Sequence, residues 1–155
     1  MKIFDHAAIF LATGAYIGKI PYAPGTFGSL WGLPAAYLLS GVRAPVAVLS
    51  IGLFIIVSIA VAHRAVGLIG RQDPGCVVID EVAGMLVTLV AVPFTAATAV
   101  AGFALFRILD ILKPFPIRML ERRVPGGAGV VLDDVAAGII ANLLLRVGFA
   151  IGELV

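Results

Sequence analysis

The sequence predicts an all-α fold, a compact membrane-embedded bundle of about five to six helices. The composition is the first reason, because 61% of the 155 residues are hydrophobic, 13% are charged and the mean hydropathy is +1.13. Soluble domains carry about 25% charged residues, so a bilayer is the expected environment. The second reason is the alternation of long uncharged runs with short stretches rich in proline, glycine and charge. At this length the chain is most simply one domain, residues 1–155.

The N-terminal part of the chain contains a short apolar run and a loop. The apolar run within residues 1–17 is too short to span a bilayer, so we expect an interfacial or packed helix there. Residues 18–29 combine two prolines with three glycines and two hydroxyl side chains. This composition predicts an ordered loop that leads into the next helix.

Two candidate membrane segments follow this loop. The first is Phe27–Val42, with Pro34 as a site where it would kink. The second is Val46–Ala62, which has no charge. Residues 63–80 are polar and basic at first and include the turn Asp73-Pro74-Gly75.

The uncharged run Val82–Phe106 is too long for one ordinary span and has Pro93 near its middle. We interpret it as a hairpin in which Glu81–Val92 leads out, the chain turns at Pro93, and Thr95–Lys113 returns. The hairpin places the basic residues 113–123 on the same side of the membrane as most other Lys and Arg side chains, as the positive-inside rule requires. A single long span would place them on the opposite side.

The last predicted segment is Val135–Ile151. With this topology, five of the nine acidic residues reach the basic, cytoplasmic ends of three different helices: Asp80, Glu81, Asp110, Asp133 and Asp134. The convergence of residues so far apart in the sequence at one end of the bundle is the main evidence for a site. We therefore expect the active site at the cytoplasmic helix ends.

Adjacent carboxylates occur at Asp80-Glu81 and again at Asp133-Asp134, each at the expected start of a helix. Asp is a favoured N-cap residue, so helix capping explains one member of each pair as readily as metal binding does. The second member is harder to explain, because neighbouring carboxylates repel each other at the edge of a low-dielectric region. A divalent cation removes this repulsion, and hard oxygen ligands suit Mg²⁺ or Mn²⁺.

Arg107, Asp110 and Lys113 follow one another at intervals of three, which places them on one helix face before Pro114 ends the helix. Salt bridges among the three are one interpretation. Beside an apolar membrane segment, however, ionisable side chains usually mark a functional site. In this second interpretation Asp110 binds the metal, while Arg107 and Lys113 neutralise a phosphoryl group.

The loop around Gly25, Thr26 and Ser29 has features of a phosphate-binding loop. Glycine lets backbone N–H groups converge, the two hydroxyls add donors, and the N-terminus of the following helix favours an anion. The loop lacks the Gly-Lys-Ser/Thr ending of a P-loop. A plain turn between a loop and a helix is the alternative.

Several functional classes are excluded. The net charge of +2, without an extended basic stripe, argues against nucleic acid as a partner. Cys76 is followed six residues later by Val82 rather than Arg, so the Cys-x5-Arg phosphatase pattern is missing. His6 and His63 lack the sequence context of histidine-based membrane phosphatases. With no covalent nucleophile, a metal-activated water is the expected attacking group.

Four motifs follow one another along the chain: Pro24-Gly25-Thr26-x-Gly28-Ser29, Asp80-Glu81-x-x-Gly84, Phe106-Arg107-Ile108-x-Asp110-x-x-Lys113-Pro114-x-Pro116 and Gly126-Gly127-x-Gly129-x-x-x-Asp133-Asp134-x-x-Ala137-Gly138. In this order they resemble the phosphatidylglycerophosphatase A family, and the resemblance covers residues 18–146. It implies a multi-pass enzyme of the bacterial inner membrane with its active site facing the cytoplasm. The implied reaction is Mg²⁺-dependent hydrolysis of phosphatidylglycerophosphate to phosphatidylglycerol and inorganic phosphate.

The resemblance also implies roles for the residues singled out above. One or two Mg²⁺ ions, with Mn²⁺ as a substitute, would be bound by Asp80, Glu81, Asp110, Asp133 and Asp134. The catalytic residues would be Asp80, Glu81, Asp110 and Asp134. The phosphate would be held by Gly25, Thr26, Ser29, Arg107 and Lys113. The partners are then the phospholipid substrate and the membrane, and the sequence leaves a homo-oligomer open.

Two other functions remain as alternatives. A CDP-alcohol phosphotransferase is also a membrane enzyme with clustered aspartates, but its Asp-x-x-Asp-Gly pattern is missing from this chain. A non-enzymatic ion-binding or transport module would need acidic residues deep within the spans, whereas these lie at predicted helix ends.

Overall fold

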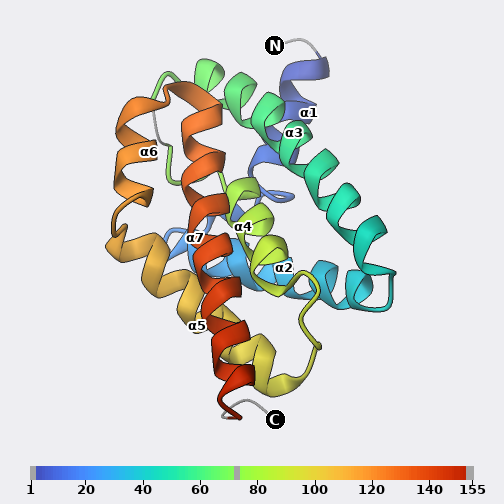
Figure 1. Ribbon diagram of the computed structural model, residues 1–155. Coiled ribbons are helices and arrows are strands. Elements are labelled where there is room, and N and C mark those ends of the chain that lie inside the picture. The colour runs from blue at the N-terminus through green and yellow to red at the C-terminus, as the bar shows by residue number, and fades with distance from the viewer. Residues whose placement is uncertain (1–2, 72–73, 153–155) are drawn as a thin grey trace.

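The protein is described by a computed structural model that covers residues 3–71 and 74–152. These residues form seven α-helices and one short 3-10 helix and contain no strand, which confirms the predicted all-α fold (Figure 1). The elements are α1 (Ile3–Ala12), η1 (Ile17–Lys19), α2 (Pro24–Ser40), α3 (Ala44–Ile69), α4 (Ile79–Leu89), α5 (Ala96–Leu112), α6 (Ile117–Arg123) and α7 (Gly126–Ala150).

The predicted hairpin is present. The uncharged run breaks into α4 and α5, and the chain turns between them at Pro93. Thr95 is the N-cap of α5, where its hydroxyl accepts a hydrogen bond from the Thr98 N–H while the Thr98 hydroxyl accepts one from the Thr95 N–H. This reciprocal cap starts the returning helix at a defined residue.

Three predicted helix boundaries were wrong. α2 begins at Pro24 rather than Phe27, because proline is well suited to the first position of a helix. α3 does not end at Ala62 but continues through the polar residues to Ile69. Its last turns are stabilised by Arg64, whose Nε lies 3.1 Å from Oδ1 of the buried Asp5 on α1. An ion pair between two helices thus supports the extension of α3 into the polar and basic residues after Ala62.

The third error concerns α7, which begins at Gly126 instead of Val135. The glycines that open the fourth motif are therefore in its first turns. A Cβ atom at Gly127 would collide with the backbone of His63, and one at Gly129 with the carbonyl oxygen of Val124. These glycines let the start of α7 lie directly against α3 and the end of α6.

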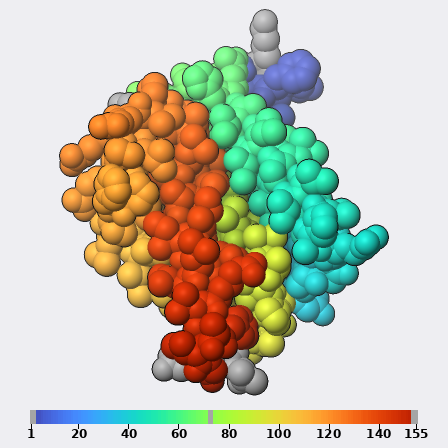
Figure 2. Space-filling view, in the orientation of Figure 1, coloured from blue at the N-terminus to red at the C-terminus, as the bar shows by residue number. Residues whose placement is uncertain are grey.

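α4 is the central helix of the bundle. All of its residues except Glu81 are buried, and it packs against α2, α3, α5 and α7. In the space-filling view α3 and α7 cover much of one face, and α4 shows only as a narrow strip between them (Figure 2). The N-terminus of α4 is thus held in position from several sides.

Glycines set the distance between α4 and α7. A Cβ at Gly84 would lie 2.8 Å from the Asp134 carbonyl oxygen and would overlap the ring of Phe106. A Cβ at Gly138 would collide with the carbonyl oxygen of Gly84. Because neither residue has a side chain, the two backbones approach closely, and the first turn of α4 lies beside Asp134.

The C-terminal end of α4 is held by α7. The side-chain amide of Asn142 donates hydrogen bonds to the carbonyl oxygens of Thr88, at 2.8 Å, and Val90, at 3.0 Å. Arg146 donates to Asn142 Oδ1 at 2.8 Å and to the Ala91 carbonyl at 3.1 Å. Carbonyl groups without helical partners are thereby satisfied, which explains the charge within the last segment.

Two helices, α3 and α7, are long and apolar enough to cross a bilayer. α3 exposes large apolar side chains along its length, among them Leu49 (73% exposed), Leu53 (63%) and Ile56 (66%). Such a continuous apolar surface is typical of contact with lipid rather than with water. α2 has 17 residues and α4 has 11, so both are shorter than an ordinary span.

Candidate active site

A cavity of about 240 Å³ lies where the first turns of α2 and α4 meet the end of α5 and the second turn of α7. Its walls include seven of the charged residues singled out from the sequence: Asp80, Glu81, Arg107, Asp110, Lys113, Asp133 and Asp134. The convergence expected of the five carboxylates is therefore present in the fold. The structure sorts them into two groups.

The first group is a triad formed by Asp80, Glu81 and Asp134. One carboxylate oxygen from each residue lies within 4.8 Å of the other two. Each residue also has a buried oxygen without a hydrogen-bond partner among the described residues: Asp80 Oδ1, Glu81 Oε2 and Asp134 Oδ2. Buried polar atoms are nearly always hydrogen-bonded, so three unsatisfied carboxylate oxygens in one triad need an explanation. A divalent cation fits, because it binds hard oxygen ligands and removes their mutual repulsion.

Two triad members belong to α4, which is too short to span a bilayer. Burial raises the pKa of Asp80 well above its ordinary value of 3.8, and the negative charges of Glu81 and Asp134 raise it further. Burial also raises the pKa of Glu81, although a hydrogen bond with Asp80 lowers it in part. Without a cation, the triad therefore tends to hold protons.

In the second group each carboxylate has a basic partner. Arg107 Nη1 lies 2.6 Å from Asp110 Oδ2, one helical turn along α5, and both side chains are 15% exposed. Lys113 Nζ lies 2.7 Å from Asp133 Oδ2 and 3.1 Å from Glu121 Oε1. Of the salt bridges predicted among Arg107, Asp110 and Lys113, only the Arg107–Asp110 pair is present, because Lys113 pairs with Asp133 and Glu121 instead.

Lys113 stays charged in this position. Burial alone would lower its pKa, but hydrogen bonds and attraction from Asp133 and Glu121 outweigh this effect and raise the pKa above its ordinary value of 10.5. The buried Nε of Arg107 has no hydrogen-bond partner among the described residues, so this N–H can donate to a ligand. Two cationic side chains therefore border the carboxylate triad.

Gly25 lies where α2 enters the site. A Cβ at this position would overlap Glu81 Oε1 and lie 3.0 Å from Arg107 Nη1, so only glycine leaves room for both groups. Thr26 and Ser29, the other residues predicted to bind phosphate, are not among those that line the cavity. The buried Ser29 hydroxyl donates instead to the Gly25 carbonyl at 2.8 Å, within the first turns of α2.

The charged cavity has the composition of a phosphoryl-transfer site, and comparison with known proteins decides the family. Residues 10–149 match the family described as Phosphatidylglycerophosphatase A. The chain belongs to this family. It is 41% identical to the Phosphatidylglycerophosphatase A of Escherichia coli strain K12 over 140 residues, which cover 89% of this chain and 81% of that protein.

Two further relatives have similar coverage. The Phosphatidylglycerophosphatase A of Haemophilus influenzae is 36% identical over 137 residues, 87% of this chain and 84% of the relative. A Bacteroides thetaiotaomicron protein named "Putative phosphatidylinositol-3-phosphatase" is 37% identical over 160 residues, 95% of this chain and 96% of the relative. No solved structure matches the chain.

Membership of the phosphatidylglycerophosphatase A family confirms the resemblance noted in the four motifs and the prediction of a phosphatase enzyme. It decides against the CDP-alcohol phosphotransferase and against a non-enzymatic transport module. A phosphatase needs groups that bind phosphate and activate water, and the charged side chains of the cavity are groups of these kinds.

Helix capping does not account for the carboxylates of this family member. Val78, not Asp80, is the N-cap of α4, and Pro125 is the N-cap of α7. Asp133 and Asp134 lie in the second turn of α7, where Asp133 Oδ1 accepts the Asp134 N–H at 3.0 Å.

Sequence reasoning missed one charged residue at this site, Glu121. It pairs with Lys113 across the turn between α5 and α6. The two residues are eight positions apart and on different helices, so no helical period connects them. The contact could have been predicted only if a separate helix after Pro116 had been predicted first.

Proposed function

We propose that this chain hydrolyses the terminal phosphomonoester of phosphatidylglycerophosphate and releases phosphatidylglycerol and inorganic phosphate. The observation that carries the proposal is the buried triad of unsatisfied carboxylate oxygens beside two cationic side chains, in a chain of this family. The cation is Mg²⁺, with Mn²⁺ as a substitute, and Asp80, Glu81 and Asp134 would hold it.

A bound divalent cation would polarise a phosphoryl oxygen and lower the pKa of a bound water. Residues of the chain itself bind and orient the phosphoryl group. Arg107 and Lys113 bind the non-bridging phosphoryl oxygens and balance the charge that develops on them. Asp110 holds the Arg107 guanidinium in place through the 2.6 Å ion pair.

In the reaction the water oxygen forms a bond to phosphorus while the bond between phosphorus and the glycerol oxygen breaks. A carboxylate of the triad accepts the proton of the attacking water. The protonated carboxylate then gives this proton to the leaving glycerol oxygen, which ends as a hydroxyl, so the products are the diester lipid and phosphate and the carboxylate is again ionised. This division of roles needs no covalent nucleophile.

We further propose that α3 and α7 cross the bacterial inner membrane and that the cavity faces the cytoplasm. α6, with its three arginines, lies toward the same end of the bundle as the N-terminus of α4, whereas α3 begins at the other end (Figure 1). Basic residues favour the cytoplasmic side. In a Cys76→Ser background, a membrane-impermeant thiol reagent added to spheroplasts should label Arg43→Cys but not Arg122→Cys. The reverse pattern would contradict this orientation.

The experiment for the activity is phosphate release from phosphatidylglycerophosphate by the purified chain with Mg²⁺ and with EDTA. We expect EDTA to abolish release, and Glu81→Gln and Asp134→Asn each to reduce kcat by about 100-fold or more. Asp5→Asn is the matched control, because it removes a buried carboxylate that lies on α1, outside the cavity. Release that survives both EDTA and the triad variants would refute the assignment.

A further inference from the structure

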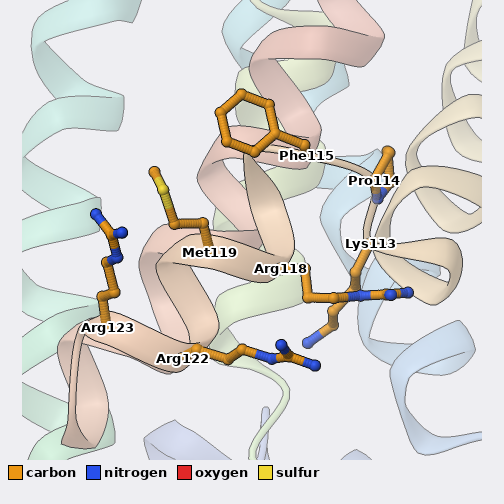
Figure 3. Close-up of a pocket in the computed structure, with 7 residues that line it drawn as sticks. All are labelled: Lys113, Pro114, Phe115, Arg118, Met119, Arg122 and Arg123. Carbon is orange, nitrogen blue, oxygen red and sulfur yellow. The ribbon is translucent and has the colours of Figure 1, made fainter.

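A second pocket adjoins the candidate active site, between the end of α5 and α6. Its volume is about 480 Å³, and its lining includes four cationic side chains and two apolar ones: Lys113, Arg118, Arg122, Arg123, Phe115 and Met119. Figure 3 shows Lys113, Arg118 and Arg122 extending to the same side of α6, whereas Phe115 and Met119 point away from this group. The pocket is open and basic, and its rim is apolar.

The positive charge of this pocket is only partly balanced. Glu121 is the one carboxylate on α6, and it is paired with Lys113. Arg118 donates to the Leu112 carbonyl at 3.0 Å, which fixes its guanidinium at the end of α5. Arg122 and Arg123 have no ion-pair partner among the residues that the structure describes. An anionic ligand would complement this charge, and arginine can bind a phosphate oxygen pair in bidentate fashion.

Lys113 is a wall residue of both this pocket and the carboxylate cavity. The two sites therefore adjoin, and one ligand with two phosphates could occupy both. The proposed substrate has this form, because a phosphodiester and a terminal phosphomonoester are attached to the same glycerol. Phe115 also lines the pocket and is 80% exposed, and an exposed aromatic side chain suits the membrane interface.

We propose that the α6 pocket is a subsite for the phosphodiester of the lipid headgroup, bound by Arg122 and Arg118 while the phosphomonoester lies in the carboxylate cavity. This inference rests on the proposed function and adds to it a source of substrate selectivity. A lipid with a phosphomonoester but no phosphodiester has no group that binds in this pocket, so the pocket does not raise its affinity.

The first test compares two substrates with the same diacylglycerol part, phosphatidylglycerophosphate and phosphatidic acid. Arg122→Gln should raise KM for phosphatidylglycerophosphate by about tenfold, the loss of one charged hydrogen bond, and leave kcat nearly unchanged. Its kinetics on phosphatidic acid should stay as in the wild type, and Arg122→Lys should restore part of the KM. Arg43→Gln is the control, because it removes an exposed arginine at the start of α3, outside the pocket.

An equal rise in KM for both lipids, or the same rise in Arg43→Gln, would overturn the subsite, because either result shows general attraction to an anionic surface. An unchanged KM in Arg122→Gln would overturn it as well. If the wild type releases no phosphate from phosphatidylglycerophosphate, the proposed function itself fails.

A binding measurement tests the pocket without catalysis. Native mass spectrometry of the purified chain should show retained phosphatidylglycerol, which has only the phosphodiester, and much less retained diacylglycerol. Arg122→Gln should bind this lipid with a Kd about tenfold higher, while Arg43→Gln should bind it as the wild type does. Equal retention in wild type and Arg122→Gln would overturn the proposal. Displacement of the lipid by an equal concentration of inorganic phosphate would identify a free-phosphate site instead and would also overturn it.

Discussion

Lys113 Nζ lies 2.7 Å from Asp133 Oδ2, and this ion pair joins the end of α5 to the second turn of α7. The Asp133 side chain is 5% exposed and that of Lys113 is 20% exposed. Lys113 is thus held in place by a carboxylate outside the triad. Its ammonium group borders the cavity that holds the triad and the pocket on α6.

This ion pair allows structural and catalytic roles of Lys113 to be separated. Lys113→Gln should lower the free energy of unfolding by about 1–3 kcal/mol, because Asp133 stays buried without its partner. The double variant Lys113→Gln/Asp133→Asn should recover most of this stability. It should not recover phosphatase activity, because the cation that binds phosphate is still absent.

Thermal unfolding in detergent and phosphate release, measured on the wild type, both single variants and the double variant, check this prediction. Recovery of activity together with stability in the double variant would mean that Lys113 acts only as a structural partner of Asp133.

Gly25 gives a test of the geometry around Glu81. Gly25→Ala places a methyl group against Glu81 Oε1 and Arg107 Nη1, so we expect kcat/KM to fall by about 100-fold through displacement of these groups. Gly52→Ala is the matched control, since Gly52 is also helical and a Cβ there meets nothing within 4 Å. An active Gly25→Ala enzyme would show that the site tolerates displacement of Glu81.

The sequence was sufficient for the fold class, the Pro93 hairpin and the set of charged residues around the cavity. Each of these depends on local patterns: uncharged runs, a proline between them and charges at their ends. The Arg107–Asp110 contact also follows directly from the helical period. These features were predictable because neighbours along the chain determine them.

Features that depend on contacts between distant segments were missed. The polar end of α3 is helical because Arg64 pairs with Asp5, and α7 starts early because Gly127 packs against His63. The division of five carboxylates into an unsatisfied triad and two ion pairs likewise depends on how close α4 and α7 come. No motif encodes that distance, which is set by the glycines at the crossing.

The stability of the metal-free protein should depend on pH in a defined direction. The pKa values of Asp80 and Glu81 are raised above 3.8 and 4.5 in the folded state, so the folded chain binds more protons than the unfolded chain. Stability then falls as pH rises through the folded-state pKa values. In EDTA the melting temperature should therefore be higher at about pH 5, just above the ordinary pKa values, than at about pH 8.

Mg²⁺ should reverse this trend, because it replaces the protons. Its stabilising effect should be larger at about pH 8 than at about pH 5. Glu81→Gln should reduce both the pH dependence in EDTA and the shift with Mg²⁺. The measurement is a melting curve at each pH with and without the metal. A shift with Mg²⁺ that is the same at both pH values, or that survives in Glu81→Gln, would contradict a cation bound at the triad.

Asn142 tests how the far end of α4 supports the site. Its amide donates to the Thr88 and Val90 carbonyls. Asn142→Leu removes this partner from Thr88 and leaves Val90 with only Arg146 Nη2 at 3.3 Å, so it should cost about 1–3 kcal/mol of unfolding free energy. Arg146→Gln should cost less, because its side chain is partly exposed and binds the Ala91 carbonyl at the surface. Chemical unfolding in mixed micelles measures both losses. We expect Asn142→Leu to lower kcat as well, since α4 carries Asp80 and Glu81 at its other end; full activity at unchanged stability would show that this end of α4 needs no support from α7.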